Sequence, residues 1–194
     1  YYSLLSAQQH FKRFDMCVFD VQQVPIHGGS IRVFVCKNSS VHAQNISERV
    51  RNLETEERAK GYNRLDSFLN FAKQVESTKR ELRARLDQIS RDGKTVIGYG
   101  ASGRANTMIQ YCEITTDMVP YIIDDAPAKT GFYTPGSHIE IILNDVLYGN
   151  ACPDYVLVFA WSFFEEISSK HENYMKNGGK MILPLPNVSI FPSE

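Results

Sequence analysis

The segment "KTVIGYGASGRAN" at residues 94–106 constrains the fold most, because an apolar run, a glycine turn and a helix-like stretch follow one another in it. Gly98, Gly100 and Gly103 stand in the spacing G-x-G-x-x-G, which is typical of the first turn of a dinucleotide-binding βαβ unit. Glycine permits a tight turn, and the free N–H groups of a helix start attract an anion. We therefore predict a strand, a turn and a helix. The turn either binds a phosphate or only packs the helix against its strand.

The rest of residues 93–194 alternates between strand and helix patterns. Apolar runs predict strands at "MVPYIIDD", "IEII", "DYVLVFAW" and "KMILPLP", and a single helix at "SFFEEISSKHENYMKNGG". Such alternation predicts a parallel sheet that is covered on both faces. The fold class is therefore α/β, with a Rossmann-like, mostly parallel sheet and helices on both faces. Only a few strands follow the glycine loop, and we find no second mononucleotide half.

The first 92 residues carry different patterns. After a helical start, "MCVFDVQQVP" and "SIRVFVCK" predict two strands joined by the loop "IHGG". Two strands cannot form a core alone, so we expect them to be the edge of a sheet whose remainder is supplied elsewhere. Residues 45–92 predict helices, opened at Ser47 and broken at Gly61.

An apolar stripe marks one face of the second of these helices. Its members recur at alternating spacings of four and three: Phe68, Ala72, Val75, Lys79, Leu82, Leu86 and Ile89. The stripe predicts a connecting helix packed on a neighbouring domain. It also leaves open a homodimer formed through residues 45–92.

Composition excludes several classes of function. The chain has 194 residues, 43% hydrophobic and 22% charged, with a net charge of -1, so we expect no nucleic acid partner. No apolar run reaches the roughly 18 residues of a membrane span, and there is no signal peptide, so we expect a cytoplasmic protein. Four scattered cysteines without a C-x-x-C pair predict reduced, buried thiols and no metal. Because the chain opens without Met in a helical pattern, we expect it to be a piece of a longer protein.

Three polar or glycine-rich segments are candidate ligand sites. The glycine loop offers N–H groups, a hydroxyl and the Arg104 charge, and "DDAPAKTGFYTPGSH" follows a strand where open α/β sheets bind ligands. "PIHGGSIR" surrounds two glycines with polar groups. The candidate substrate-binding residues are His27, Gly100, Ala101, Ser102, Gly103, Arg104, Asp124, Asp125, Lys129, Pro135, His138 and Trp161. Each has a structural alternative: a packing turn, a surface loop, a tight hairpin loop or a core aromatic.

Four segments in this order resemble the C-terminal part of sugar C-methyltransferases: "HGGSIRVFV", "GYGASGRANT", "YIIDDAPAKTGFYTPGSHIEI" and "PDYVLVFAW". Members of this family use S-adenosylmethionine to methylate a carbon of nucleotide-linked 4-keto-deoxysugars. The resemblance implies that residues 1–40 end the central methyltransferase domain, residues 41–92 form a helical connector, and residues 93–194 form the Rossmann-like C-terminal domain. The last of these shapes the sugar-nucleotide site.

The resemblance also implies what lies outside the chain. The family's Glu-His pair, assigned to acid/base work, falls immediately upstream of Tyr1, so the catalytic residues of this chain are unknown and the chain alone is expected to be inactive. His27 is the best candidate here for a polar contact near that chemistry. S-adenosylmethionine is expected to bind mainly outside this chain, and zinc in a missing N-terminal domain.

Two other functions stay open on the sequence. One is an NAD(P)-binding Rossmann domain of an oxidoreductase, for which Asp124 and Asp125 stand slightly late as the ribose-binding acid. The other is a non-catalytic Rossmann-like interaction module.

Overall fold

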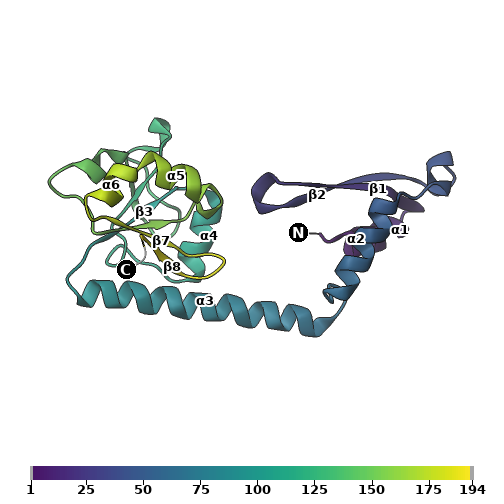
Figure 1. Cartoon of the computed structure of the whole chain (residues 1–194), viewed down its shortest axis with the longest axis horizontal. Coiled ribbons are helices and arrows are strands. Elements are labelled where there is room, and N and C mark those ends of the chain that lie inside the picture. The colour runs from purple at the N-terminus through teal and green to yellow at the C-terminus, as the bar shows by residue number, and fades with distance from the viewer. Residues whose placement is uncertain (1, 193–194) are drawn as a thin grey trace. The chain divides into compact units, whose positions relative to one another are not determined.

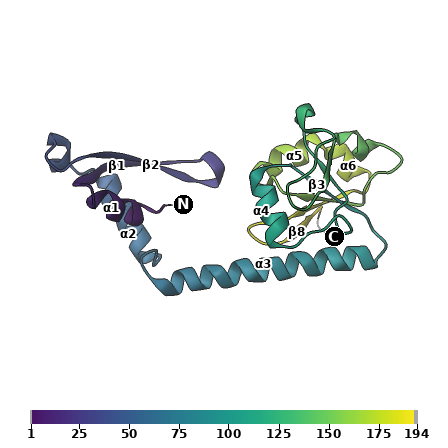
Figure 2. The same ribbon diagram turned by 180° about the vertical axis from the view of Figure 1, so that it is seen from behind.

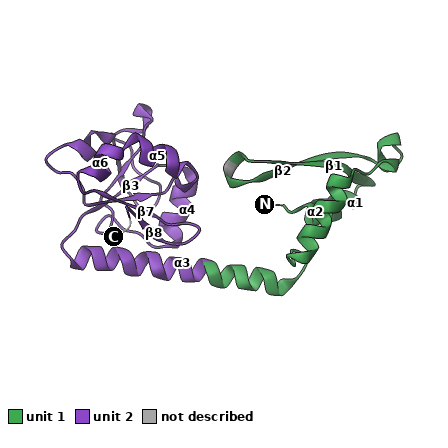
Figure 3. Cartoon of the chain, in the orientation of Figure 1, with its two compact units in different colours: residues 1–74 green, residues 75–194 purple. Residues whose placement is uncertain are grey.

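A computed structural model describes residues 2–192 and divides the chain into two compact units, residues 1–74 and residues 75–194. Figure 3 shows the extent of each unit. The division falls inside helix α3 (Leu65–Arg91), so each unit contains part of that helix. The predicted domain limits at residues 40 and 92 stay a prediction.

The first unit is a β-hairpin covered by helices. In chain order its complete elements are α1 (Leu4–Lys12), β1 (Met16–Val24), η1 (Ile26–Gly28), β2 (Ser30–Lys37), η2 (Val41–Gln44) and α2 (Glu48–Ala59). Strands β1 and β2 pair antiparallel, as the sequence predicts. The core is small and apolar: Leu4, Val18, Val21, Val50 and Leu53. The Ser47 hydroxyl accepts from the N–H of Val50 and opens α2, which confirms the predicted helix start.

A buried carboxylate from α2 fixes the start of α1. Glu57 accepts from the N–H of Leu4 at 2.7 Å and from that of Leu5 at 2.9 Å. The first N–H groups of a helix have no internal partner, and a negative charge is favoured beside them. Glu57 therefore joins the start of α1 to α2 through a carboxylate that is itself buried.

The second unit is built on a six-stranded sheet in the order β5-β4-β3-β6-β7-β8. The strands are β3 (Val96–Tyr99), β4 (Tyr121–Ile123), β5 (Glu140–Ile142), β6 (Tyr155–Val158), β7 (Lys180–Leu183) and β8 (Ser189–Phe191). All neighbours pair parallel except β7 and β8, which pair antiparallel. This is the strand order of a Rossmann fold, so the predicted fold class is confirmed.

Helices cover both faces of this sheet. The second half of α3 and helix α4 (Gly103–Tyr111) lie on one face, where Leu82, Leu86 and Ile109 pack with strand residues. Helices α5 (Phe164–Lys170) and α6 (Glu172–Lys176) lie on the other face, with Ile167 and Tyr174 in its core. Figure 1 shows the two layers on either side of β3, and Figure 2 shows the same arrangement from behind.

The apolar stripe of α3 is covered along only part of its length. Leu82, Leu86 and Ile89 are buried against the sheet, which supports the predicted packing of the connector on a domain. Phe68, near the start of the same stripe, is 58% exposed. Lys79 interrupts the stripe as a charged residue and pairs with Glu113 at 2.7 Å.

Three expectations about local structure are corrected. The single predicted helix after β6 is two helices, because His171 takes a non-helical conformation between α5 and α6. Strand β8 was not predicted, and it gives three strands on each side of the β3–β6 step, more than the few expected. Of the four free cysteines, Cys112 is buried, whereas Cys17 and Cys36 are half-buried and Cys152 is exposed.

None of the helices within residues 2–192 combines the length and apolar character that a membrane crossing requires.

The buried and exposed parts of the α3 stripe allow a matched stability test. We expect Leu82→Ala to lower the free energy of unfolding by about 2–5 kcal/mol, because it leaves a cavity under the sheet. Phe68→Ala, on the exposed part, should change it by less than about 0.5 kcal/mol. Chemical denaturation followed by circular dichroism measures both. Equal losses in the two variants would contradict the assigned burial.

Candidate functional site

The strand order of the second unit reverses between β3 and β6, and loops that follow such strands form the ligand crevice of open α/β sheets. The glycine loop leaves the carboxyl end of β3 and enters α4. Trp161 follows β6 in a short 3-10 helix, η5 (Trp161–Phe163). The structure thus brings the glycine loop and Trp161 to one edge of the sheet.

The three positions of the loop differ in why they need glycine. A Cβ on Gly98 would lie 2.7 Å from the Phe159 ring, and Gly100 has φ +96° with its Cβ position 2.8 Å from the Ala160 Cβ. Packing therefore requires glycine at both positions, and the positive φ at position 100 is a second reason for glycine there. Gly103 has no such neighbour: a Cβ there would meet nothing within 4 Å. The space beside the first residue of α4 is open.

The Asp124 carboxylate forms its hydrogen bonds with groups of the protein itself. Its carboxylate accepts from the Ala101 N–H at 2.9 Å and from Lys129 Nζ at 2.8 Å, while its other oxygen accepts from the Ala126 N–H at 2.9 Å. Lys129 also donates to the Ala101 carbonyl at 2.9 Å. The Asp124 side chain is 12% exposed, so these partners pin the glycine loop to the end of β4 rather than offering the carboxylate to a ribose.

Arg104 lies at the open start of α4. Its guanidinium carbon is 5.5 Å from the centre of the Trp161 ring, and Nη1 is 3.4 Å from the Ser162 hydroxyl. A cation over an indole face is attracted by the ring quadrupole. The pair joins the loops that follow β3 and β6. The Ser102 hydroxyl caps α4 by accepting from the Ala105 N–H.

Asp125 belongs to a separate cluster on the other face of the sheet. It accepts from the Tyr99 hydroxyl at 2.7 Å and from Asn144 at 3.0 Å, and pairs with Lys170 at 2.7 Å. Burial raises the pKa of Asp125, but Lys170 and Tyr99 outweigh it and hold the pKa below the ordinary value. The two adjacent aspartates, which the sequence suggested as one ligand site, therefore have different surroundings.

The cluster continues from Tyr99 to a buried histidine. Tyr99 has one hydroxyl proton, which goes to Asp125, so at 3.0 Å it accepts from His171 Nε2–H. His171 Nδ1 then accepts from the Tyr148 hydroxyl at 2.7 Å. Burial, followed by the Lys170 charge, lowers the pKa of His171 and keeps the ring neutral. Burial, together with Asp125, raises the pKa of Tyr99 above its ordinary value. The groups form one directed chain of hydrogen bonds from Tyr148 to Asp125.

Pro135 and His138 lie in the turn before β5. The Pro135 carbonyl accepts from Gln110 at 3.0 Å, near the C-terminal end of α4. Gln110 lies seven positions after Gly103 along α4, a rise of about 10 Å. Pro135 therefore lies away from the glycine loop. His138 is an exposed residue with φ +53°.

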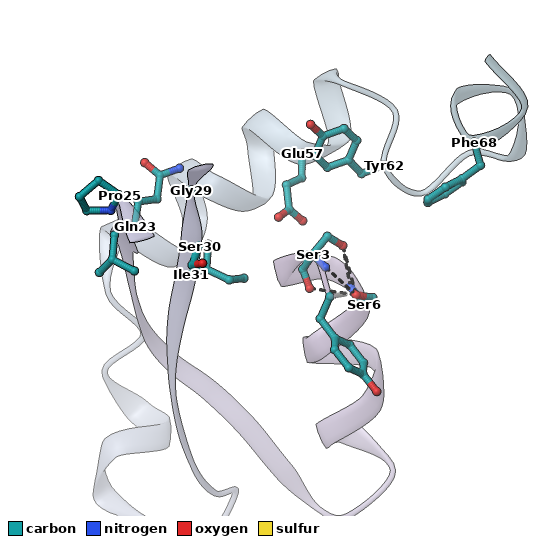
Figure 4. A pocket seen from close by; sticks show the side chains of 12 residues that line it. Ser3, Ser6, Gln23, Pro25, Gly29, Ser30, Ile31, Glu57, Tyr62 and Phe68 are labelled. Carbon is teal, nitrogen blue, oxygen red and sulfur yellow. Dashed lines mark hydrogen bonds between the residues drawn. The ribbon is translucent and has the colours of Figure 1, made fainter. Parts of the chain in front are cut away.

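The first unit contains a pocket of about 890 Å³ beside the hairpin tip. Figure 4 shows Pro25 and Gly29 of the tip across from Ser3, with the Glu57 carboxylate directed toward the start of α1. Its lining mixes hydroxyl, amide and apolar groups: Tyr2, Ser3, Ser6, Gln23, Val24, Pro25, Gly29, Ser30, Ile31, Glu57, Tyr62 and Phe68. This size suits a small-molecule ligand. His27 lies in η1 at the tip, and its side chain is outside the described part of the chain.

Comparison with known proteins places the chain in a family. The sequence profile of the C-methyltransferase C-terminal domain matches residues 25–186. The chain belongs to this family. It is 30% identical over 194 residues to the C-methyltransferase NovU of Streptomyces niveus, a match that covers 100% of the chain and 46% of that relative. The chain therefore spans about half the length of the curated relative that it matches.

In this C-methyltransferase domain, two features of the structure are not visible in the sequence. His171 stands alone in a helical pattern, and its partners Tyr99 and Tyr148 are 72 and 23 residues away in sequence. The pocket of the first unit cannot be predicted from sequence patterns either, because its lining combines residues of the hairpin tip, α1, α2 and α3. Within residues 2–192, no group of three or more His, Cys, Asp or Glu side chains gathers as a metal site.

The glycines of the loop can be separated by substitution. We expect Gly100→Ala to lower the free energy of unfolding by more than about 1 kcal/mol, because its φ is positive and Ala160 fills the space. Gly103→Ala should stay within about 0.5 kcal/mol, since its Cβ position is open. Thermal and denaturant unfolding of both variants checks this. A Gly103→Ala variant as unstable as Gly100→Ala would show that the space is not open.

The buried histidine predicts a pH dependence of stability. Because the folded pKa of His171 is lowered, the unfolded chain binds a proton first, and the free energy of unfolding decreases as the pH falls through about 6.5 toward the folded pKa. We expect His171→Gln to reduce this slope. Denaturant titrations at several pH values measure it, and His138→Gln, at an exposed turn, is the matched control. An unchanged slope in His171→Gln would contradict a neutral buried ring.

Proposed function

We propose that this chain is part of an S-adenosylmethionine-dependent methyltransferase that adds a methyl group to a carbon of a nucleotide-linked keto-deoxysugar. In this proposal the chain shapes the sugar-nucleotide site, and it does not methylate by itself. Membership of the C-methyltransferase family supports the reaction class. The substrate is inferred from the resemblance and from the two candidate sites.

The observation that carries the proposal is the pocket at the hairpin tip. Tyr2 is among its lining residues. The hydroxyl and amide groups of Ser3, Ser30 and Gln23 suit the hydroxyls of a sugar.

In the second unit, considered by itself, the open start of α4 suits a phosphate group. Gly103 leaves space beside the first helical residue, and the first N–H groups of a helix attract anions. Arg104 supplies a positive charge, held over Trp161. In the proposed mechanism, this chain binds and orients the acceptor. Proton removal beside its ketone needs a base near the reacting carbon and donors at the developing oxyanion.

Asp124 argues against the dinucleotide alternative. In a Rossmann dehydrogenase an acidic side chain at this place binds the ribose hydroxyls of the cofactor. Here all the described contacts of Asp124 go to Ala101, Ala126 and Lys129. A ribose would have to displace them.

The remaining parts of the proposal concern groups outside the chain. S-adenosylmethionine supplies an electrophilic methyl group when bound, and we propose that it is held mainly by a preceding domain, with zinc in a further one. A cytoplasmic location belongs to the same proposal. A homodimer through residues 45–92 stays a prediction, which sedimentation of the purified chain would test.

Isothermal titration of the 194-residue chain tests the acceptor site. We expect heat of binding with a deoxythymidine-diphosphate 4-keto-deoxysugar and none with NAD. Arg104→Gln should weaken binding by about tenfold or more, because a hydrogen bond to a charged group contributes about 1.5–3 kcal/mol. Gly103→Ala should weaken it while leaving stability unchanged.

Lys73→Gln, on the exposed part of α3, is the matched control and should bind like the unmodified chain. Binding of NAD alone would favour the oxidoreductase alternative and contradict the proposal. No binding of either ligand would show that this part of the protein does not hold the sugar nucleotide, in favour of an interaction module.

A further inference from the structure

Two cysteines that are far apart in the sequence meet across the hairpin of the first unit. Cys17 of β1 and Cys36 of β2 are direct partners in the antiparallel register. Their Sγ atoms are 3.6 Å apart, which is within the distance of a thiol–thiol hydrogen bond. The sequence contains no C-x-x-C pair, and the 18 residues between the two thiols hide their pairing.

The backbone geometry of this position suits a covalent bond. Directly opposite residues of an antiparallel pair have Cα atoms about 4.5–5.5 Å apart and side chains on the same face of the sheet. A disulfide requires Cα atoms about 4.4–6.8 Å apart. Cys17 and Cys36 therefore need a side-chain rotation and no backbone movement to bond. Both are half-buried, so a small reagent can approach them.

The surroundings hold the two strands in place. Next to the pair, Asn38 donates to Asp15 through its backbone N–H at 3.0 Å and through its side-chain amide at 2.8 Å, which closes the base of the hairpin. On the other side, the register shifts between Val18 and Asp20. The thiol pair thus lies between a fixed base and an irregularity of the ladder.

We propose that Cys17 and Cys36 form a reversible redox site that oxidises to a cross-strand disulfide by exchange with a small disulfide such as oxidised glutathione. One cysteine loses its proton and its thiolate attacks a glutathione sulfur, which displaces one glutathione thiolate and leaves a mixed disulfide. The second cysteine thiolate attacks the protein sulfur of that mixed disulfide and displaces the second glutathione. Two electrons pass from the cysteine sulfurs to glutathione, and the two released protons balance its two thiolates.

Burial and the neighbouring Cys36 thiol raise the pKa of Cys17. Because the thiolate is the attacking species, exchange should be faster in mildly alkaline buffer.

The disulfide would make the pocket at the other end of the hairpin sensitive to the redox state of the two cysteines. It closes the loop that contains Gly29 and Ser30, which line the pocket. A slip of one residue in the ladder would turn every side chain of a strand to the other face, and a cross-strand bond forbids such a slip. Oxidation should therefore fix the register of the strands that carry the pocket.

The other two cysteines serve as internal controls. Cys112 is buried in the core of the second unit, and Cys152 is exposed, with its thiol donating to the Leu147 carbonyl at 3.1 Å. Both belong to residues 75–194, whereas the pair belongs to residues 1–74.

Oxidation of the purified, reduced chain with oxidised glutathione tests the proposal. Glutathione bound to single thiols is first removed by mild exchange, and the protein is then denatured. We expect a thiol-specific dye to label only two of the four cysteines. The intact mass should be lower than that of the reduced chain by two hydrogen atoms. Trypsin cuts after Arg32, so residues 14–32 and 33–37 should appear as one linked peptide that separates on reduction.

Variants make the assignment specific. Cys112→Ser/Cys152→Ser should still form the bond and lose all its remaining free thiols, whereas Cys17→Ser and Cys36→Ala should each form no intramolecular bond. Oxidant that modifies exposed Cys152 while Cys17 and Cys36 stay reduced would overturn the proposal. A bond between two chains, or one that includes Cys112 or Cys152, would also overturn it.

Discussion

The close approach of the β3 and β6 ends at Gly100 is the constraint on which the rest of the second unit depends. Ala160 occupies the place where a side chain on Gly100 would lie, so the chain can leave β3 only through a residue without Cβ. This turn aims α4 across one face of the sheet. It also presents the Ala101 N–H to Asp124, which fixes the loop to the neighbouring strand. Packing, backbone conformation and one buried carboxylate thus determine the loop together.

This arrangement changes how the G-x-G-x-x-G spacing should be interpreted. Two of its glycines are explained by neighbours inside the protein, and the acidic residue that would bind a ribose is a structural partner of the loop. What is left for a ligand is the open space at Gly103 and the Arg104 charge held over Trp161. Such a site suits a phosphate group better than a complete dinucleotide.

Much of the fold could be predicted from the sequence, because its signals are local. Strand periodicity, the Ser47 cap and the glycine turn depend on residues that are close along the chain. The site was less predictable, since it depends on pairings over long separations. Asp124 and Asp125 are adjacent and identical in type. Because successive side chains at the end of a strand point to opposite faces, the two carboxylates have different partners. The pairing of Cys17 with Cys36 likewise depends on a register that composition does not reveal.

The directed chain from Tyr148 to Asp125 has a polarity that is set from one end. The Asp125 carboxylate can only accept, so it fixes the direction of the Tyr99 proton, and that in turn fixes the tautomer of His171 and the orientation of the Tyr148 hydroxyl. Four side chains therefore share one proton arrangement. A protonated or amidated residue at position 125 would keep an acceptor oxygen but gain a donor, so both directions of the chain, as far as the Tyr148 hydroxyl, would become possible.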